Sequence, residues 1–80
     1  MKVKVRLFGH FADVWPGERE LELSDGATAG DLAERVSTSA EKLESVVRIC
    51  RAAVNEEYVP FSYRLEENDL VVFIPPMSGG

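Results

Sequence analysis

The stretch that decides the fold is Leu70-Val71-Val72-Phe73-Ile74, five apolar residues that follow the polar segment 66–69. A strand with one face in water alternates apolar and polar side chains, whereas an unbroken apolar run is typical of a strand covered at least partly on both faces. We therefore expect 70–74 to be a central strand. It should end at Pro75 and Pro76, because proline has no backbone N–H to give to a neighbouring strand.

The N-terminal segment provides the expected neighbour of this strand. Residues 2–8, with the sequence KVKVRLF, alternate apolar and polar side chains in the period of a half-buried strand. Residues 20–23 alternate again, so the two segments should form a hairpin in which a basic face pairs with an acidic one. We expect 70–74 to lie beside 2–8 in parallel. The loop of the hairpin should be ordered by side chains that pack back onto the core: Phe11, Val14 or Trp15.

The middle of the chain predicts one main helix. Thr28 stands three residues before Asp31, the spacing of a capping box, and apolar residues then recur with helical spacing over 29–37. The same spacing recurs over 43–50, although the segment from Val46 could equally begin a strand. Short strands are expected at 51–54 and 58–59. The predicted fold is α+β, with a mixed sheet packed on one main helix.

Composition limits the classes of function. The 80 residues are enough for one domain, which we place at 1–75, with 76–80 as a flexible tail. The net charge of −5 disfavours nucleic acids and anionic membranes and suggests a partner with a basic docking face. One cysteine and no apolar run near ~20 residues point to a cytoplasmic protein rather than a secreted or membrane-spanning one.

The residues usual in catalysis do not form a site. His10 and Cys50 are the only histidine and cysteine, so a transition-metal site is not expected. His10 is interpreted as a loop or surface residue, and Cys50 as a small buried hydrophobe on an apolar stripe. The carboxylates are spread along the chain in the manner of a solvated surface.

The C-terminus has a more informative pattern, PPMSGG over 75–80. The prolines favour an extended backbone that leaves the sheet, and the following residues can reach roughly 15 Å. Glycine has no Cβ, so Gly79 and Gly80 could enter a channel too narrow for other residues. These features predict a carboxylate carried at the end of a thin extension. The alternative is a frayed terminus that happens to end in glycine.

Several of these segments together resemble a known family. The segment Ala52-Ala53-Val54-Asn55, residues Leu65, Asn68-Asp69 and Val71, and the ending 74–80 are similar to the small subunit of molybdopterin synthase, a ubiquitin-like β-grasp sulfur carrier. The resemblance covers the whole chain. Relatives often carry Arg-Glu after the first strand and Gly-Asp before the last, where this chain has Ala12-Asp13 and Asn68-Asp69.

The resemblance implies a chemistry for the tail. A ubiquitin-activating-type adenylyltransferase would use ATP to join AMP to the Gly80 carboxylate, and a sulfur donor would displace AMP to leave a thiocarboxylate. This group would deliver sulfur inside the large subunit of the synthase, in a heterotetramer, to form the dithiolene of molybdopterin. The carrier itself would hold no cofactor stably, and Gly79 would serve access to the channel.

The resemblance also implies a docking surface. Alternation places Phe8 on the face away from Val3, Val5 and Leu7, and by resemblance Tyr58 and Ile74 should join it in an exposed apolar patch beside the tail. The tail residues should join the contact: Pro75, Pro76, Met77 and Ser78. Two other functions stay open. The chain could be a carrier or protein modifier for tRNA thiolation, thiamine synthesis or lysine conjugation, or it could be a non-catalytic β-grasp interaction module.

Overall fold

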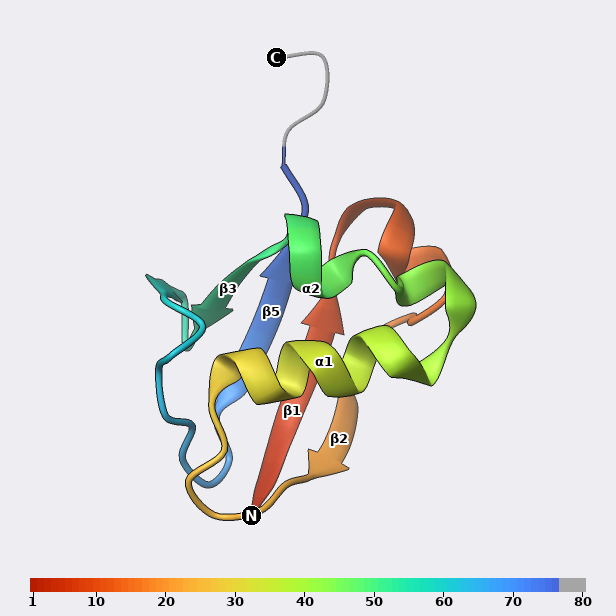
Figure 1. The fold of residues 1–80 in the computed structure, drawn as a ribbon. Helices are drawn as coiled ribbons and strands as arrows, with labels where there is room; N and C mark the ends of the chain where they lie inside the picture. The colour runs from red at the N-terminus through yellow and green to blue at the C-terminus, as the bar shows by residue number, and fades with distance from the viewer. Residues whose placement is uncertain (77–80) are drawn as a thin grey trace.

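The computed structural model describes residues 1–76 and contains a mixed five-stranded sheet with helices packed on one face (Figure 1). The strand order across the sheet is β2-β1-β5-β3-β4. The strands span the following residues: β1 Lys2–Leu7, β2 Arg19–Glu22, β3 Arg51–Val54, β4 Glu57–Val59 and β5 Leu70–Ile74. We call the face that carries the helices the inner face and the opposite one the outer face.

The central position of β5 is confirmed. It pairs in parallel with β1 and antiparallel with β3, with Leu7 opposite Phe73 and Val54 opposite Val71. Val71 and Phe73 point into the core and are fully buried. The residues that alternate with them on the outer face are half-buried: Leu70, Val72 and Ile74. Cover is therefore complete on the inner face and partial on the outer one.

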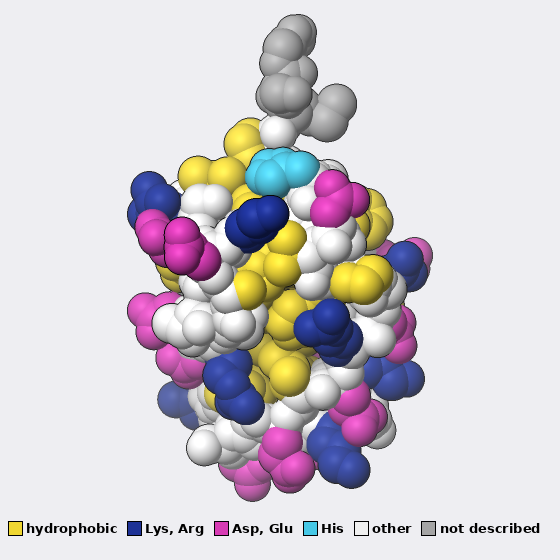
Figure 2. Space-filling model, turned by 90° about the vertical axis from the view of Figure 1, so that its right-hand side faces the viewer, with side chains coloured by type: hydrophobic (Ala, Val, Ile, Leu, Met, Phe, Trp, Pro, Cys, Tyr) yellow, Lys and Arg dark blue, Asp and Glu magenta, His cyan; other side chains and the backbone are white. Residues whose placement is uncertain are grey.

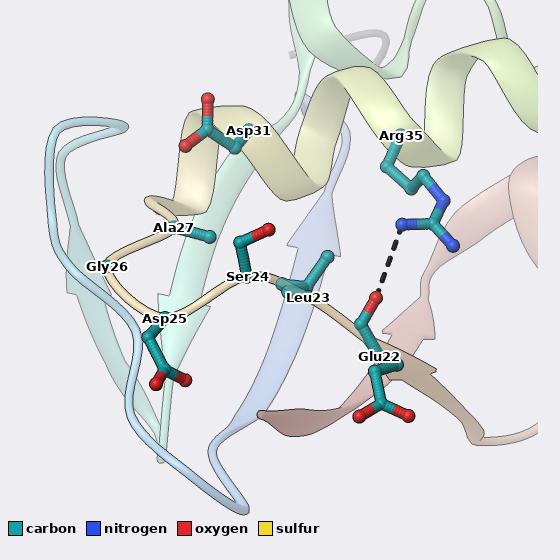
Figure 3. A pocket seen from close by; sticks show the side chains of 8 residues that line it. All are labelled: Glu22, Leu23, Ser24, Asp25, Gly26, Ala27, Asp31 and Arg35. Carbon is teal, nitrogen blue, oxygen red and sulfur yellow. Dashed lines mark hydrogen bonds between the residues drawn. The ribbon is translucent and has the colours of Figure 1, made fainter.

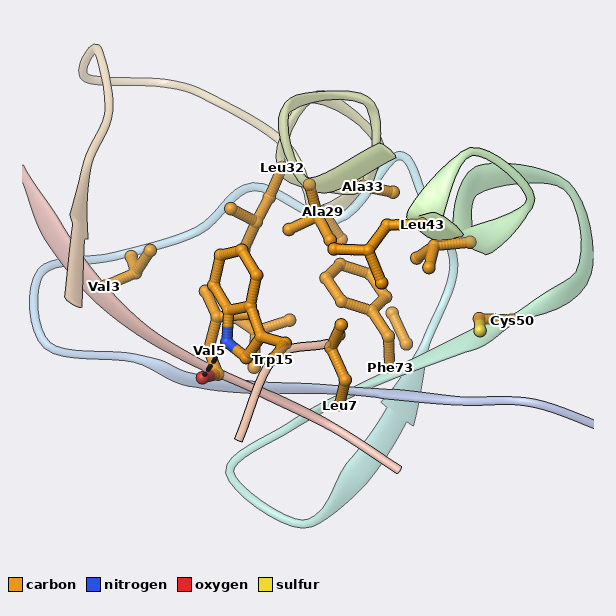
Figure 4. Packing of buried hydrophobic residues seen from close by; sticks show 14 of the residues in the cluster. Val3, Val5, Leu7, Trp15, Ala29, Leu32, Ala33, Leu43, Cys50 and Phe73 are labelled. Carbon is orange, nitrogen blue, oxygen red and sulfur yellow. Dashed lines mark hydrogen bonds between the residues drawn. The ribbon is translucent and has the colours of Figure 1, made fainter. Parts of the chain in front are cut away.

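The N-terminal hairpin forms as the alternation predicts. β1 pairs antiparallel with β2, and the register sets Lys2 opposite Glu22 and Lys4 opposite Glu20. The loop contains a short 3-10 helix, η1 (Gly9–Asp13), and is ordered mainly by buried Phe11 and by Trp15. The Trp15 indole N–H donates a hydrogen bond to the backbone oxygen of Val5 at 3.2 Å (Figure 4). The ring is therefore packed in the core while its polar N–H has a hydrogen-bond partner.

The main helix α1 (Ala29–Ser39) begins where the capping box predicts and runs two residues beyond the expected end. The Thr28 hydroxyl accepts from the Asp31 N–H at 3.1 Å, and the Asp31 carboxylate accepts from the Thr28 N–H at 2.9 Å. One side of the helix is fully buried against the sheet (Figure 4), through Ala29, Leu32, Ala33 and Val36. The segment around Phe61 comes close to the first turn of the helix at Gly30, where an added Cβ would lie 3.1 Å from the Phe61 carbonyl oxygen.

The second helical segment is broken in two. A 3-10 turn, η2 (Glu41–Leu43), precedes a single helical turn, α2 (Val46–Ile49), where periodicity suggested a helix over 43–50. Ser37 is one cause, since its hydroxyl accepts from the Val47 N–H at 2.9 Å and fixes the approach of α2 to α1. The alternative strand beginning at Val46 is wrong, because β3 starts only at Arg51.

Candidate functional site

The C-terminal segment leaves the sheet at the end of β5 (Figure 1). Pro75 is half-buried and Pro76 is exposed, so the sheet ends where the prolines predict. The remaining expectations for this segment concern Met77, Ser78, Gly79 and Gly80, which lie outside the described residues. The site that can be described is therefore the surface around the base of the segment.

Gly9 lies directly against that base. Its φ is +67°, and a Cβ added there would lie 2.9 Å from Cγ of Pro75. The preceding Phe8 N–H donates to the backbone oxygen of Phe73 at 3.2 Å, which continues the β1–β5 pairing by one residue. The sequence predicts that 2–8 and 70–74 are parallel neighbours, but the register that sets Gly9 against Pro75 is seen only in the structure.

The three residues of the expected docking patch do not all touch one another. Phe8 is 47% exposed and follows Leu7, which is paired with Phe73, so Phe8 lies beside Ile74 on the outer face. Tyr58 is 58% exposed but lies on β4, beyond β3. Arg51 bridges the gap, since it is paired with Ile74 and its guanidinium lies 4.2 Å from the centre of the Tyr58 ring.

Another side of the molecule also has hydrophobic side chains bordered by basic ones. Figure 2 looks from the side of η1 and β2, and on this view hydrophobic side chains form a band that rises toward the C-terminal segment. Lys and Arg side chains lie on both sides of the band, and Asp and Glu gather toward the periphery. Apolar surface bordered by cations is thus a feature of more than one side of this fold.

Asn55, the last residue of the Ala-Val-Asn segment, has a structural role. Asn55 and Glu56 form a two-residue turn between β3 and β4 with φ values of +49° and +76°. The Asn55 side chain donates to buried Asp69 at 3.0 Å and accepts from the Leu70 N–H at 3.1 Å, which ties this turn to the start of β5. Asn68 has a φ of +69°, a conformation that asparagine tolerates better than most non-glycine residues.

Cys50 and His10 are placed as the sequence suggested. Cys50 is buried, and burial raises the pKa of its thiol from 9.0 to about 11. Because the thiolate is the nucleophile, the thiol is poorly reactive at neutral pH. His10 is exposed on η1, with its ring centre 4.1 Å from that of Phe11.

A surface hollow lies at the other end of the molecule. Its volume is about 580 Å³, and it is lined by the β2–α1 connection and by Asp31 and Arg35 of α1 (Figure 3). The Arg35 guanidinium donates to the backbone oxygen of Glu22 at 3.3 Å across this hollow.

Within residues 1–76, no three His, Cys, Asp or Glu side chains are grouped as metal ligands. None of the helices in that range is long and apolar enough to cross a bilayer.

Comparison with known proteins gives consistent results. Residues 5–80 match the ThiS family. The chain is 37% identical to the molybdopterin synthase sulfur carrier subunit of Chlamydomonas reinhardtii, over all of both chains. It is 32% identical to the subunit of the same name from Mycobacterium tuberculosis, over 100% of this chain and 99% of that one.

Solved structures share the fold. The putative molybdopterin converting factor, subunit 1, from Pyrococcus furiosus superposes with a TM-score of 0.82 at 32% identity, over 95% of this chain and 98% of that one. SAMP1 from Haloferax volcanii gives 0.83 at 22% identity, over all of both chains. The complex of subunits 1 and 2 of the molybdopterin-converting factor from Helicobacter pylori gives 0.72 at 22% identity, again over all of both chains. These matches confirm the ubiquitin-like β-grasp fold.

Proposed function

The chain belongs to the ThiS family, and from that premise we propose that it is the sulfur carrier subunit of a molybdopterin synthase. The observation that carries the proposal is full-length identity of 37% and 32% to two sulfur carrier subunits of that enzyme. The Gly79-Gly80 ending gives this assignment a chemical basis, because a terminal carboxylate can be activated and can carry sulfur.

The proposed cycle uses only the carboxylate of Gly80. The carboxylate attacks the α-phosphate of ATP on an adenylyltransferase, and pyrophosphate leaves. A sulfide equivalent from the sulfur donor then displaces AMP and forms a thiocarboxylate. In the large subunit the sulfur passes to a cyclic pyranopterin phosphate, and water restores the carboxylate. The chain needs no acid, base or metal of its own for these steps.

Cys50 is the one other residue that could carry sulfur, as a persulfide. Its thiol is buried at the end of α2, and burial raises its pKa to about 11. A thiol that is protonated and covered at neutral pH is a poor nucleophile toward a sulfur donor. This favours Gly80 over Cys50 as the site of the transferable sulfur.

Docking is assigned to the outer face at the base of the tail. Phe8 and Ile74 form adjoining apolar surface there, and Tyr58 extends it through Arg51. A small domain gains little stability from an aromatic side chain that is half in water, so this surface supports a partner contact. The Helicobacter pylori complex of subunits 1 and 2 supports the large subunit as that partner. Pro75, Pro76, Met77 and Ser78 would then lead into it, with Gly79 needed for access.

A second candidate is a protein modifier or a carrier for another sulfur pathway. The likeness to small archaeal modifier protein 1 of Haloferax volcanii, at 20% identity, favours it only through the shared fold. Either function would use the same activated terminus, so the two differ in the acceptor rather than in the chemistry of Gly80.

Reconstitution with purified components tests the proposal. The chain, a large subunit, an activating enzyme, ATP, sulfide and the pyranopterin precursor should together yield molybdopterin. Deleting Gly80 should abolish the product, and Gly79→Val should block it by bulk in the narrow channel, both without a change in thermal unfolding. Product from the Gly80-deleted chain would refute the carrier assignment. Activation of Gly80 without molybdopterin, but with sulfur or the chain itself transferred to tRNA or lysine, would favour the second candidate.

A further inference from the structure

We propose that the outer face at the tail end docks on an acidic surface of the large subunit, in which carboxylates lie on both sides of an apolar ridge. We call this surface of the chain the arginine-flanked face and define it by its central and flanking residues: Arg6, Phe8, Arg51, Val72 and Ile74. The inference deepens the proposed function, because it specifies the charge of the partner surface as well as its apolar character.

The register of the sheet builds this face. On the outer side of β5, Val72 has Arg6 as its neighbour on β1, and Ile74 has Arg51 as its neighbour on β3. Neighbouring strands lie about 4.8 Å apart and each residue advances about 3.3 Å along a strand, so the two arginines, two strands and two residues apart, flank the apolar residues with their backbones roughly 12 Å apart. The apolar centre is half-buried, and both arginines are exposed.

The charge of this end differs from that of the rest of the outer face. Toward the start of β1, the register sets each lysine opposite a glutamate of β2: Lys2 opposite Glu22 and Lys4 opposite Glu20. Toward the tail, the paired rows across β1, β5, β3 and β4 contain no acidic residue: Arg6, Val72, Ala53 and Tyr58 in one row, Phe8, Ile74 and Arg51 in the next. On the hairpin side, continuing the register would set Glu18 opposite Arg6, but Glu18 lies before β2 begins and is in neither of the ion pairs of residues 1–76.

Neither arginine is neutralised within the described chain. The ion pairs in residues 1–76 join the Met1 amino group to Asp25 and Arg48 to Glu44. Arg51 is held by the Tyr58 ring instead, which presents its guanidinium in a fixed place beside the apolar centre. Arginine suits such a position, because its planar donors bind carboxylates in pairs and it loses hydration more easily than lysine.

The negative net charge of the chain would help to orient it on an acidic partner. With a net charge of −5, most of the surface would be repelled by an acidic partner, while the arginine-flanked face would be attracted. Local charge thus predicts a partner opposite in sign to the one that net charge alone suggests. A second copy of this chain is a poor occupant, since it would bring the same arginines against each other.

The test measures binding of the full chain to the purified large subunit of molybdopterin synthase from the same cell. Binding should weaken as salt is raised, and Arg6→Glu/Arg51→Glu should lower affinity by about 100-fold at low salt, mainly through slower association. Arg6→Gln/Arg51→Gln should fall between this variant and the wild type. Lys42→Glu is the matched control for the single substitution Arg51→Glu, because each makes the same change in charge, and Lys42 is exposed on η2, in the helical layer. It should bind within about two-fold of the wild type.

The outcomes separate the two proposals. If the wild type binds and neither double substitution of the arginines changes its affinity, the inference is overturned and the carrier function is left intact. A loss from Lys42→Glu equal to that from Arg51→Glu would also overturn it, since net charge rather than this face would then decide. A wild-type chain that does not bind the large subunit at all would overturn the proposed function and the inference with it. Thermal unfolding of each variant should match that of the wild type. If a glutamate substitution disturbs the fold, the affinity of the double glutamine variant decides instead.

Discussion

Gly9 combines a positive φ with a close contact to Pro75, at the base of the tail. Three turn glycines have positive φ, at +67° for Gly9, +69° for Gly17 and +87° for Gly26, but only Gly9 has an atom within reach of an added Cβ. A side chain in this region of φ costs about 1–2 kcal/mol. At Gly9 it would also press on Pro75, which sets the direction in which the tail leaves the sheet.

Gly9→Ala should therefore destabilise the domain more than Gly17→Ala does. Both substitutions carry the same backbone cost, and overpacking against Pro75 should add at least about 1 kcal/mol at Gly9. Urea unfolding of the two variants isolates this difference, with Gly17 as the control. Gly9→Ala should also lower sulfur transfer, because Pro75 must move. Equal losses of stability and full transfer would show that the contact with Pro75 is unimportant.

Cys50 predicts a pH dependence with a definite sign. Its thiol has a pKa of about 11 in the folded chain against 9.0 for an ordinary thiol. Between these values the unfolded chain loses the proton while the folded chain keeps it. The contribution to stability is therefore complete below pH 9 and is lost as pH rises toward 11, by up to about 2–3 kcal/mol.

The measurement compares wild type with Cys50→Ala by urea unfolding at about pH 8 and about pH 10.5. The wild type should lose stability more steeply over this interval, since lysines and tyrosines titrate in both proteins and cancel in the comparison. The variant should also keep sulfur transfer. Parallel pH profiles would mean that the thiol is not shielded by burial.

At the scale of elements, α1 packs one fully buried side against the sheet. Leu32 is fully buried at the centre of its apolar side, above Val5 and Phe73 in the same core (Figure 4). Leu32→Ala should cost about 2–4 kcal/mol in the free energy of unfolding. Leu21→Ala is the control, because Leu21 is only half-buried on the edge strand β2 and should cost roughly 1 kcal/mol. Similar losses for both would contradict the assignment of the core.

The next prediction concerns Phe8, directly after β1, as a docking residue. Phe8→Glu should weaken binding to the large subunit by at least about ten-fold, because it places a charge in the apolar contact. The fold should be kept, since the Phe8 side chain is 47% exposed and only its backbone N–H bonds to β5. Calorimetry of the complex gives the affinity, and circular dichroism checks the fold. Tyr63→Glu, at an exposed aromatic in the segment between β4 and β5, is the control. Unchanged binding of Phe8→Glu would remove Phe8 from the interface.

The elements that the sequence predicts well are those with a strong local signal. The period of two in 2–8, the apolar run 70–74 and the Thr28–Asp31 capping box each specify one conformation, and each is confirmed. The segment 40–49 is different, because its short turns depend on a hydrogen bond from Val47 to Ser37 ten residues away. No local pattern encodes that contact.

At the scale of the whole molecule, strand order decides what the sequence could not provide. Arg6 and Arg51 flank the same apolar residues only because β5 inserts between β1 and β3. Gly9 meets Pro75 through the register between β1 and β5, which the predicted parallel pairing alone does not specify. The tail and its expected docking residues could be identified from their order along the chain, whereas the arginines that surround them required the assembled sheet.

The central claim is that sulfur is carried on the carboxylate of Gly80, and isolation of the C-terminal peptide tests it most directly. The chain would be incubated with ATP, an activating enzyme and a sulfur source, and a thiocarboxylate on that peptide would be captured with an alkylating reagent. Intact mass is not sufficient, since oxidation of Met77 or Cys50 gives nearly the same gain. We predict that the captured label lies on Gly80 in the wild type and in Cys50→Ala, and that it is absent when Gly80 is deleted. A label on Cys50, or an unlabelled C-terminal peptide from a preparation that still transfers sulfur, would contradict the claim.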